Sequence, residues 1–449
     1  MKRTFVFLLF ALFTHSYSQC WREIAAGSSY SVAIADDGTI WNWGYDANTV
    51  DSNIPLQVGS ANNWKSVATK SASTLAIQTD GTLWGWGVNT YSQLGIDGDP
   101  PIFVMVPTQV GFENNWNNVA TGLTHTIAIK NDGTLWAWGG NANGQLGNGN
   151  TNQVNTPIQI GIENNWKTCA TGDNYAMAIK TDGTLWGWGN NASGQLGDGT
   201  SVDKFIPTPI GNDSNWKNIA TGYRHTMAIK NDGTLWGWGQ NSLGELGTGD
   251  FNEKHSPTQI ENETNWKSVS AGYGFTLAIK NDGSLWACGD NYKGQFGNGI
   301  SQLENNTLIQ IGNDLNWKMV ATGDNHTIAL KTDSMLWSTG DNSTGELGNG
   351  TYNDSYSFNA ITCPILSIHE NGNSSGLTVY PNPAKEVLTI TNNGNELIDS
   401  VQIIDIVGNV IKEENGNTST INVGNLQQGL YILQLTLGYK VQKIKFVKL

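Results

Sequence analysis

The chain has 449 residues, of which 54 are glycine and 38% are hydrophobic. This composition suits many short strands joined by tight turns better than helices, and a closed ring of repeats can reach this length as one domain. The formal net charge of −14 disfavours contact with a phosphate backbone, so we predict no nucleic-acid partner.

Residues 1–19 have the layout of a secretory signal peptide. Met1, Lys2 and Arg3 form a basic start, an apolar run covers residues 5–13, and a short polar exit precedes Cys20. The run is too short to span a membrane stably. We therefore predict an exported chain without a transmembrane segment.

From Trp21 onward one pattern recurs with a period of about 50 residues, and its clearest copy covers 116–139. The tryptophans that open the seven copies are Trp21, Trp64, Trp116, Trp166, Trp216, Trp266 and Trp317. Each copy has four strand-like pieces, which in the third copy are 118–120, 125–130, 134–138 and 157–160. Four-stranded units repeated at this period indicate blades around an axis, so we predict a seven-bladed β-propeller over 20–362.

The second and third pieces of a repeat are joined by Asp-Gly, a strong signal for a tight hairpin turn. This pair is present in every copy except the seventh, which has Asp333-Ser334. All 19 tryptophans fall at three repeat positions, which indicates blade packing and leaves none for a special site. A Gly-Gln-Leu-Gly loop or a variant follows the third piece in every copy but the first, and its Leu or Phe is expected to plug inward.

These motifs resemble the regulator of chromosome condensation family of seven-bladed propellers over nearly all of 21–361. The resemblance implies three functions: nucleotide exchange with chromatin binding, light sensing, or protein binding by exported bacterial members. The predicted export and the acidic charge oppose the first, which we keep as a lesser alternative by family analogy. Only residues 222–226 approach the Gly-Trp-Arg-His-Thr motif of the plant light receptor, which opposes the second.

A linker rich in Asn, Gly and Ser covers 363–376. Alternating apolar segments then predict a small immunoglobulin-like β-sandwich over 377–449. This part resembles the type A sorting domain of the type IX secretion system, which implies the secretion machinery as a partner. It also implies a location at the cell surface or in the medium of a Gram-negative bacterium. The motif residues are Tyr380, Pro381, Asn382, Pro383, Gly429, Leu430, Tyr431, Lys443 and Lys445.

Four cysteines suit an exported protein with at most two disulfides. Cys169 and Cys288 occupy repeat positions of apolar residues, so we expect them to be buried. Cys20 and Cys363 flank the first and seventh repeats, where a closed ring brings its ends together. We predict a Cys20–Cys363 disulfide that clasps the propeller.

Candidate chemistry is sparse along the chain. His125, His225 and His326 share a repeat position with Tyr and Phe, which indicates packing, and no clustered Cys/His pattern exists, so we predict no metal and no cofactor. Acidic residues of the variable loops could face one another across a glycosidic bond. This leaves a polysaccharide-active hydrolase or lyase as an alternative, although a solvated acidic rim is the simpler interpretation and no catalytic residue is predicted.

The second repeat has the longest variable loop, 95–107, which carries an apolar run. Its candidate binding residues are Asp97, Asp99, Ile102, Phe103 and Met105. An apolar loop on an acidic propeller can anchor a partner, and the alternative is that it folds back on its own blade. We predict a monomeric, non-catalytic, exported binding propeller whose partner is a surface protein or glycan.

Overall fold

In six of the seven repeats an Asp-Gly turn joins the second and third strands, and its aspartate also holds the start of the third strand. In the third repeat the Asp132 carboxylate accepts the backbone N–H of Thr134 at 3.0 Å and its hydroxyl at 2.7 Å. Gly133 takes a φ of +79°, which favours glycine. The Thr134 hydroxyl then accepts the indole N–H of Trp136 at 2.9 Å, so the turn also orients the third strand.

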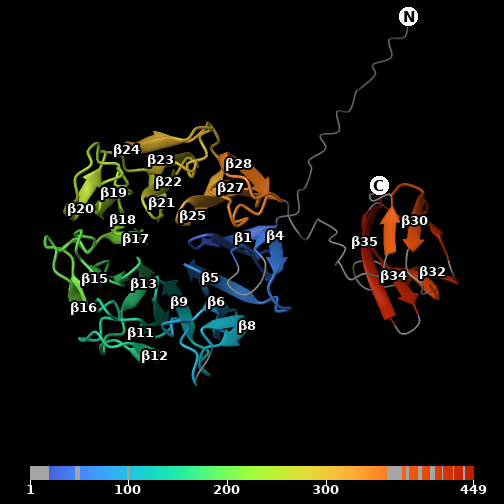
Figure 1. The fold of residues 1–449 in the computed structure, drawn as a ribbon, viewed down its shortest axis with the longest axis horizontal. Helices are drawn as coiled ribbons and strands as arrows, with labels where there is room; N and C mark the ends of the chain where they lie inside the picture. The colour runs from blue at the N-terminus through green and yellow to red at the C-terminus, as the bar shows by residue number, and fades with distance from the viewer. Residues whose placement is uncertain are drawn as a thin grey trace, which may run out of the picture. The chain divides into compact units, whose positions relative to one another are not determined.

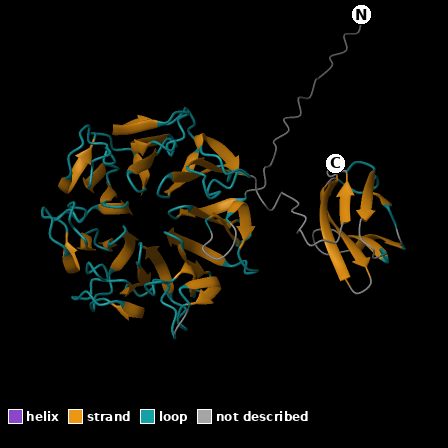
Figure 2. Cartoon of the chain, viewed as in Figure 1, coloured by secondary structure: helices purple, strands orange, loops and turns teal. Residues whose placement is uncertain are grey.

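In the computed structural model, the described residues are 20–45, 51–98, 101–361, 377–380, 384–392, 397–404, 410–416, 418–427, 429–437 and 440–448. Within these ranges the chain forms strands and turns without helices (Figure 2), so no helix that could span a membrane is found there. The chain divides into two compact units, Met1–Ile361 and Thr362–Leu449. The predicted signal peptide, 1–19, and linker, 363–376, lie outside the described residues.

Each sequence repeat forms one antiparallel sheet whose strands pair in chain order. The first three blades are β1 (Trp21–Ala26), β2 (Tyr30–Ala35), β3 (Ile40–Gly44), β4 (Ser52–Gln57); β5 (Trp64–Lys70), β6 (Ser73–Gln78), β7 (Leu83–Val88), β8 (Phe103–Gln109); and β9 (Trp116–Thr121), β10 (His125–Lys130), β11 (Leu135–Gly139), β12 (Val154–Gln159). The next two are β13 (Trp166–Thr171), β14 (Tyr175–Lys180), β15 (Leu185–Gly189), β16 (Lys204–Pro209); and β17 (Trp216–Thr221), β18 (His225–Lys230), β19 (Leu235–Gly239), β20 (Lys254–Ile260). The last two are β21 (Trp266–Ala271), β22 (Phe275–Lys280), β23 (Leu285–Asn291), β24 (Gln302–Gln310); and β25 (Trp317–Thr322), β26 (His326–Lys331), β27 (Leu336–Gly340), β28 (Ser355–Ile361).

The seven sheets formed by the described residues stand around one axis (Figure 1), which confirms the predicted seven-bladed propeller. The first strand of each blade is innermost and packs against the innermost strands of both neighbours. Within a blade the opening tryptophan meets the tryptophans of the third strand, as Trp116 meets Trp136 and Trp138 at centroid distances of 5.9 Å. The predicted role of the repeated tryptophans in blade packing is thus confirmed for these residues.

The ring closes where the seventh blade packs on the first. The indole N–H of Trp43 donates to the Glu346 carbonyl at 2.9 Å, and the Gly350 N–H donates to the Asn53 carbonyl at 2.8 Å. Because every blade is built from four consecutive strands, the two ends of the ring share no strand in the part of the propeller described. Cys20 is buried there, whereas Cys363 lies outside the described residues, so their disulfide stays a prediction. Cys169 and Cys288 are buried free thiols, as expected.

The second unit packs two antiparallel sheets against a shared apolar core, which confirms the predicted β-sandwich. One sheet is β29 (Leu377–Tyr380), β30 (Val387–Asn392) and β33 (Thr420–Asn422), and the other is β32 (Val410–Asn415), β31 (Ser400–Ile404), β34 (Gly429–Leu437) and β35 (Lys440–Lys448). Leu388 and Ile421 of the first sheet and Val401, Leu433 and Phe446 of the second belong to one buried cluster.

Candidate functional site

Neighbouring blades are joined by the loop that carries Gly-Gln-Leu-Gly. In most junctions a carbonyl of this loop accepts the indole N–H of the second tryptophan in the next blade. These bonds are Trp138 to Gln93 at 2.9 Å, Trp188 to Gln145 at 3.0 Å, Trp238 to Gln195 at 2.9 Å and Trp43 to Glu346 at 2.9 Å. Where the tryptophan is replaced, Cys288 donates to the corresponding carbonyl of Glu245, and Thr339 donates to the carbonyl of Gly294, one residue before the corresponding Gln295.

The leucine of the same loop fills the wedge between two blades. Leu94 is fully buried in a cluster with Trp116 and Trp138 of the next blade. It packs over Gly85 of its own blade, where a Cβ would lie only 3.3 Å from the Leu94 Cβ. The position of Gly85 therefore needs a small residue wherever the plug is present.

The junction between the first and second blades lacks this plug, because the first repeat has no Gly-Gln-Leu-Gly. Trp86 occupies the position of Trp138 and is only 4% exposed, yet its indole N–H has no partner among the described residues. Thr74 differs from its equivalent Thr126, which donates to the Gln93 carbonyl at 2.7 Å. The Thr74 hydroxyl instead pairs with that of Tyr30 at 2.5 Å.

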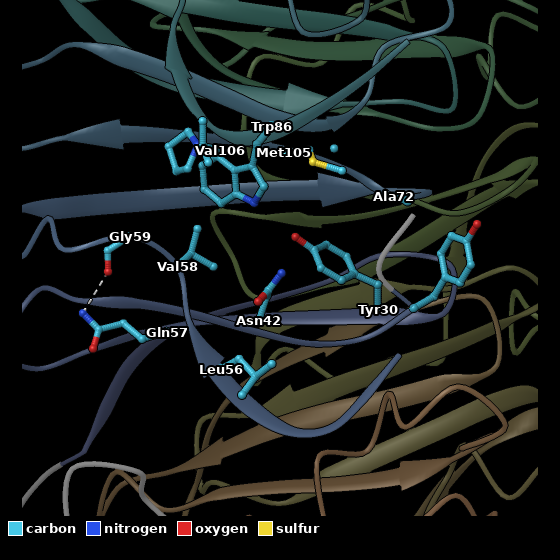
Figure 3. Close-up of a pocket in the computed structure, with 13 residues that line it drawn as sticks. Tyr30, Asn42, Leu56, Gln57, Val58, Gly59, Ala72, Trp86, Met105 and Val106 are labelled. Carbon is cyan, nitrogen blue, oxygen red and sulfur yellow. Dashed lines mark hydrogen bonds between the residues drawn. The ribbon is translucent and has the colours of Figure 1, made fainter. Parts of the chain in front are cut away.

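A cavity of about 320 Å³ lies at this junction. Figure 3 shows Trp86, Met105 and Val106 on one side of it, and Asn42, Leu56 and Val58 on the other. Its lining combines apolar side chains with five residues that carry polar groups, Trp86, Asn42, Gln57, Tyr30 and Tyr45, a combination typical of ligand-binding pockets. Of the described residues that line it, none is Asp or Glu, so this cavity does not supply the facing carboxylates that a glycosidase needs.

The candidate residues of the second repeat do not all reach this cavity. Met105, 64% exposed, lines it. Ile102, 59% exposed, and the half-buried Phe103 do not. Asp97 is exposed and accepts the Gly98 N–H at 2.9 Å, and Asp99 lies outside the described residues.

The predicted loop 95–107 is shorter than expected. Its alternating apolar run pairs with β7, Val88 opposite Phe103 and Gly87 opposite Val104, so β8 begins at Phe103. From Phe103 onward the segment folds back on its own blade, which is the alternative stated for this loop. Val104 is buried there.

Sequence reasoning missed Trp86 and Asn42, although the chain carries a signal for both. The absence of Gly-Gln-Leu-Gly from the first repeat implies that Trp86 has lost its usual acceptor. Asn42 stands where the other repeats have a small residue: Gly85, Ala137, Gly187, Gly237, Ala287 and Ser338. A larger side chain fits there because no plug covers it.

A second cluster of polar residues lies on the face of the propeller where the innermost strands end. The Lys70 ammonium is 3.5 Å from the Asp173 carboxylate, and burial raises the pKa of Asp173 despite this contact. Tyr223 and Tyr273 stack at 4.3 Å, with Arg224 over Tyr223 at 4.9 Å. These side chains satisfy one another, so we do not assign a ligand to them.

The repeated histidines are buried and neutral. Desolvation lowers the pKa of His125 and His225 to about 3 and that of His326 to about 4. His225 and His326 hydrogen-bond with Thr276 at 3.1 Å and Ser31 at 2.9 Å, which fits the packing role predicted for this position. Within the described ranges, no three His, Cys, Asp or Glu residues are grouped as a metal site would require.

Five segments of the propeller match the regulator of chromosome condensation (RCC1) repeat, and together they cover more than half of the chain: 80–129, 132–179, 182–229, 232–279 and 282–330. The chain belongs to the regulator of chromosome condensation repeat family. Proteins built from this repeat are mostly binding or regulatory proteins.

The second unit, predicted to be a sorting domain, also matches a known family. Residues 378–448 match the secretion system C-terminal sorting domain, which marks the RCC1-repeat chain as a protein exported by the type IX system to the cell surface or the medium. Gly429, Leu430 and Tyr431 open β34, and the Tyr431 ring stacks on Phe446 at 5.7 Å. Tyr380 ends β29, Lys443 and Lys445 lie in β35, and Pro381, Asn382 and Pro383 fall outside the described residues.

Individual relatives share the fold over different lengths. The ultraviolet-B receptor UVR8 of Arabidopsis thaliana is 30% identical over 139 residues, which are 29% of this chain and only 31% of the receptor. Human WBSCR16 superposes with a TM-score of 0.64 at 22% identity, covering 70% of this chain and 86% of that one. Prp20p of Saccharomyces cerevisiae, described with its binding to Gsp1p and histones, gives 0.65 at 21% identity, covering 81% and 89%. At these identities the two structures establish the fold alone.

Proposed function

We propose that this exported propeller is a non-catalytic binding protein that takes up a peptide segment of a partner protein in the cavity between its first two blades. The buried indole N–H of Trp86 carries the proposal. A buried donor left without an acceptor costs about 1–3 kcal/mol, so a ligand that brings a carbonyl oxygen to Trp86 gains that energy on binding.

The blade junctions that have a Gly-Gln-Leu-Gly loop indicate which kind of ligand fits the cavity between the first two blades. At those junctions the chain supplies a loop whose carbonyl meets the tryptophan and whose leucine enters the wedge, as Gln93 and Leu94 do for Trp138. A partner segment with the same two features would place its apolar side chain against Leu56, Val58 and Met105. The Asn42 amide offers a second polar contact beside it.

The test uses the chain's own plug as a probe. A blocked hexapeptide Asn-Gly-Gln-Leu-Gly-Asn, the sequence of 143–148, is titrated calorimetrically into the full chain. We expect saturable binding, weakened about 5- to 30-fold by Trp86→Phe, because this change removes the indole N–H together with the five-membered ring that carries it. Replacing the peptide's leucine by alanine should weaken binding similarly, since a buried leucine contributes about 2 kcal/mol.

Trp238→Phe is the matched control, because its indole N–H is already bonded to Gln195 at 2.9 Å. It should leave the peptide affinity unchanged while lowering the free energy of unfolding by about 1–2 kcal/mol more than Trp86→Phe does, because only this variant leaves a carbonyl unpaired. Trp86→Phe should lower stability only through the lost contacts of the five-membered ring, a loss that both variants share. No binding of the peptide, or an equal loss of affinity in both variants, would refute the proposal.

A further inference from the structure

The lysines of the propeller fall into two groups. Of the fourteen between Cys20 and Ile361, nine form ion pairs within the described residues: Lys70, Lys130, Lys180, Lys204, Lys230, Lys254, Lys280, Lys293 and Lys331. The other five enter no ion pair there: Lys65, Lys167, Lys217, Lys267 and Lys318. We call these five the lysine ring.

All members of the lysine ring occupy one repeat position, directly after the tryptophan that opens the innermost strand. They belong to β5, β13, β17, β21 and β25. The first blade has Arg22 at this position, and its guanidinium donates to the Trp64 carbonyl of the next blade. Only the third blade breaks the series, with Asn117.

This position lies on one face of the propeller, because the innermost strands surround the axis and begin on the same face. The N–H of each opening tryptophan after the first donates to the glycine carbonyl of the preceding Asp-Gly turn, as Trp64 does to Gly38 at 3.1 Å. The lysine ring is thus on the face of these turns, opposite the face that holds Lys70 and Asp173. Lys65, Lys167, Lys217 and Lys267 are exposed, and Lys318 is half-buried.

The paired lysines show what a structural role looks like in this fold. The Lys130 ammonium is 2.7 Å from the Glu113 carboxylate and lies over Trp136 at 3.4 Å from the ring centroid, and Lys180 repeats this arrangement with Glu163 and Trp186. The lysine ring has no comparable carboxylate or aromatic contact in the described residues. Like charges gathered around one axis repel one another, so their unpaired state favours an anionic ligand.

We propose that the lysine ring binds a compact ligand carrying several phosphate groups. Lysine binds phosphate groups as a compact point charge. Charges arranged around an axis match a ligand whose own charges are close together. Glu23 interacts electrostatically with Arg22 and Lys318, so the test variants are chosen from Lys167, Lys217 and Lys267.

Calorimetric titration of the full chain with inositol hexakisphosphate, and separately with tripolyphosphate, tests this proposal. We expect saturable binding at 50 mM NaCl that weakens at least tenfold at 300 mM, because salt screens exposed charges. Lys217→Gln with Lys267→Gln should weaken binding at least tenfold. The matched control, Lys204→Gln with Lys254→Gln, removes the same charge from lysines paired with Asp198 and Asp250 and should change affinity less than twofold.

Three outcomes would overturn the proposal. These are no saturable binding of either phosphate, equal losses in the two double variants, or tighter binding of a 20-base-pair DNA duplex than of both phosphates. Thermal unfolding of each variant verifies that a lost affinity is not a lost fold. Binding to the lysine ring is measured without the peptide, so its result is independent of the cavity between the first two blades.

Discussion

The carboxyl group of Glu245 makes the stability of one blade junction depend on pH. It occupies the plug-loop position of Gln145 and Gln195, and burial raises its pKa to about 7. One carboxylate oxygen accepts the Leu243 N–H at 2.8 Å, while the other has no partner in the described residues. A glutamine would keep the acceptor and place a neutral amide where the charge is costly.

Replacing Glu245 by Gln should therefore stabilise the protein at alkaline pH. Because the folded-state pKa is raised, the favourable contribution of the protonated carboxyl is complete below about 4.5 and is lost as the pH rises through about 7. Urea unfolding should give Glu245→Gln about 1–3 kcal/mol more stability than the parent at pH 8 and no difference at pH 4. Gln195→Glu, the reverse change, should destabilise at pH 8; a gain of Glu245→Gln that is equal at both pH values would contradict this account.

At the scale of the element, the first repeat lacks the Gly-Gln-Leu-Gly loop, and a cavity lies at the junction between the first and second blades. Replacing residues 45–51 by the loop 190–203 of the fourth repeat, together with Asn42→Gly, should fill the cavity. The new carbonyl would accept the Trp86 N–H and the new leucine would be buried, raising the free energy of unfolding by about 1–3 kcal/mol. Peptide titration should then show no binding.

The control is the same graft with its leucine changed to serine, which adds the same loop length without the apolar side chain. It should recover less stability than the leucine graft, because serine buries little apolar surface. Unchanged peptide affinity in the leucine graft would mean that the cavity is not the site.

The strands themselves follow from local sequence, and the cavity does not. Asp-Gly turns and paired tryptophans locate the second and third strands of the third repeat within one residue: 125–130 and 134–138 were expected, and His125–Lys130 and Leu135–Gly139 are found. The outer strand begins at Val154 rather than 157 because a register shift lets it pair with Gly139. The cavity depends on which loop meets Trp86 across blades, a contact that no local pattern encodes.

At the scale of the molecule, the ring is closed by side-by-side contacts of its first and last blades. Its stability should thus depend on the predicted Cys20–Cys363 disulfide. We expect reductant or Cys20→Ser to lower the free energy of unfolding by about 2–5 kcal/mol, because the link closes a very long loop of the unfolded chain.

A non-reducing digest should contain the Cys20–Cys363 peptide, and urea unfolding with and without reductant should measure its contribution. Cys169→Ser is the control, since Cys169 is a buried free thiol, and its response to reductant should equal that of the parent. Stability of the parent that is unaffected by reductant would argue against the clasp.

The construction of every described blade from consecutive strands has a consequence for folding kinetics. Each hydrogen-bonded ladder joins residues of one repeat, so a blade can form soon after its own segment of about 50 residues is available. Contacts of short sequence separation form quickly. The meeting of Asp324 with Ser28, and of Glu346 with Trp43, requires the whole length of the propeller. We therefore expect the ring to close only when the last blade packs against the first, after the individual blades have formed.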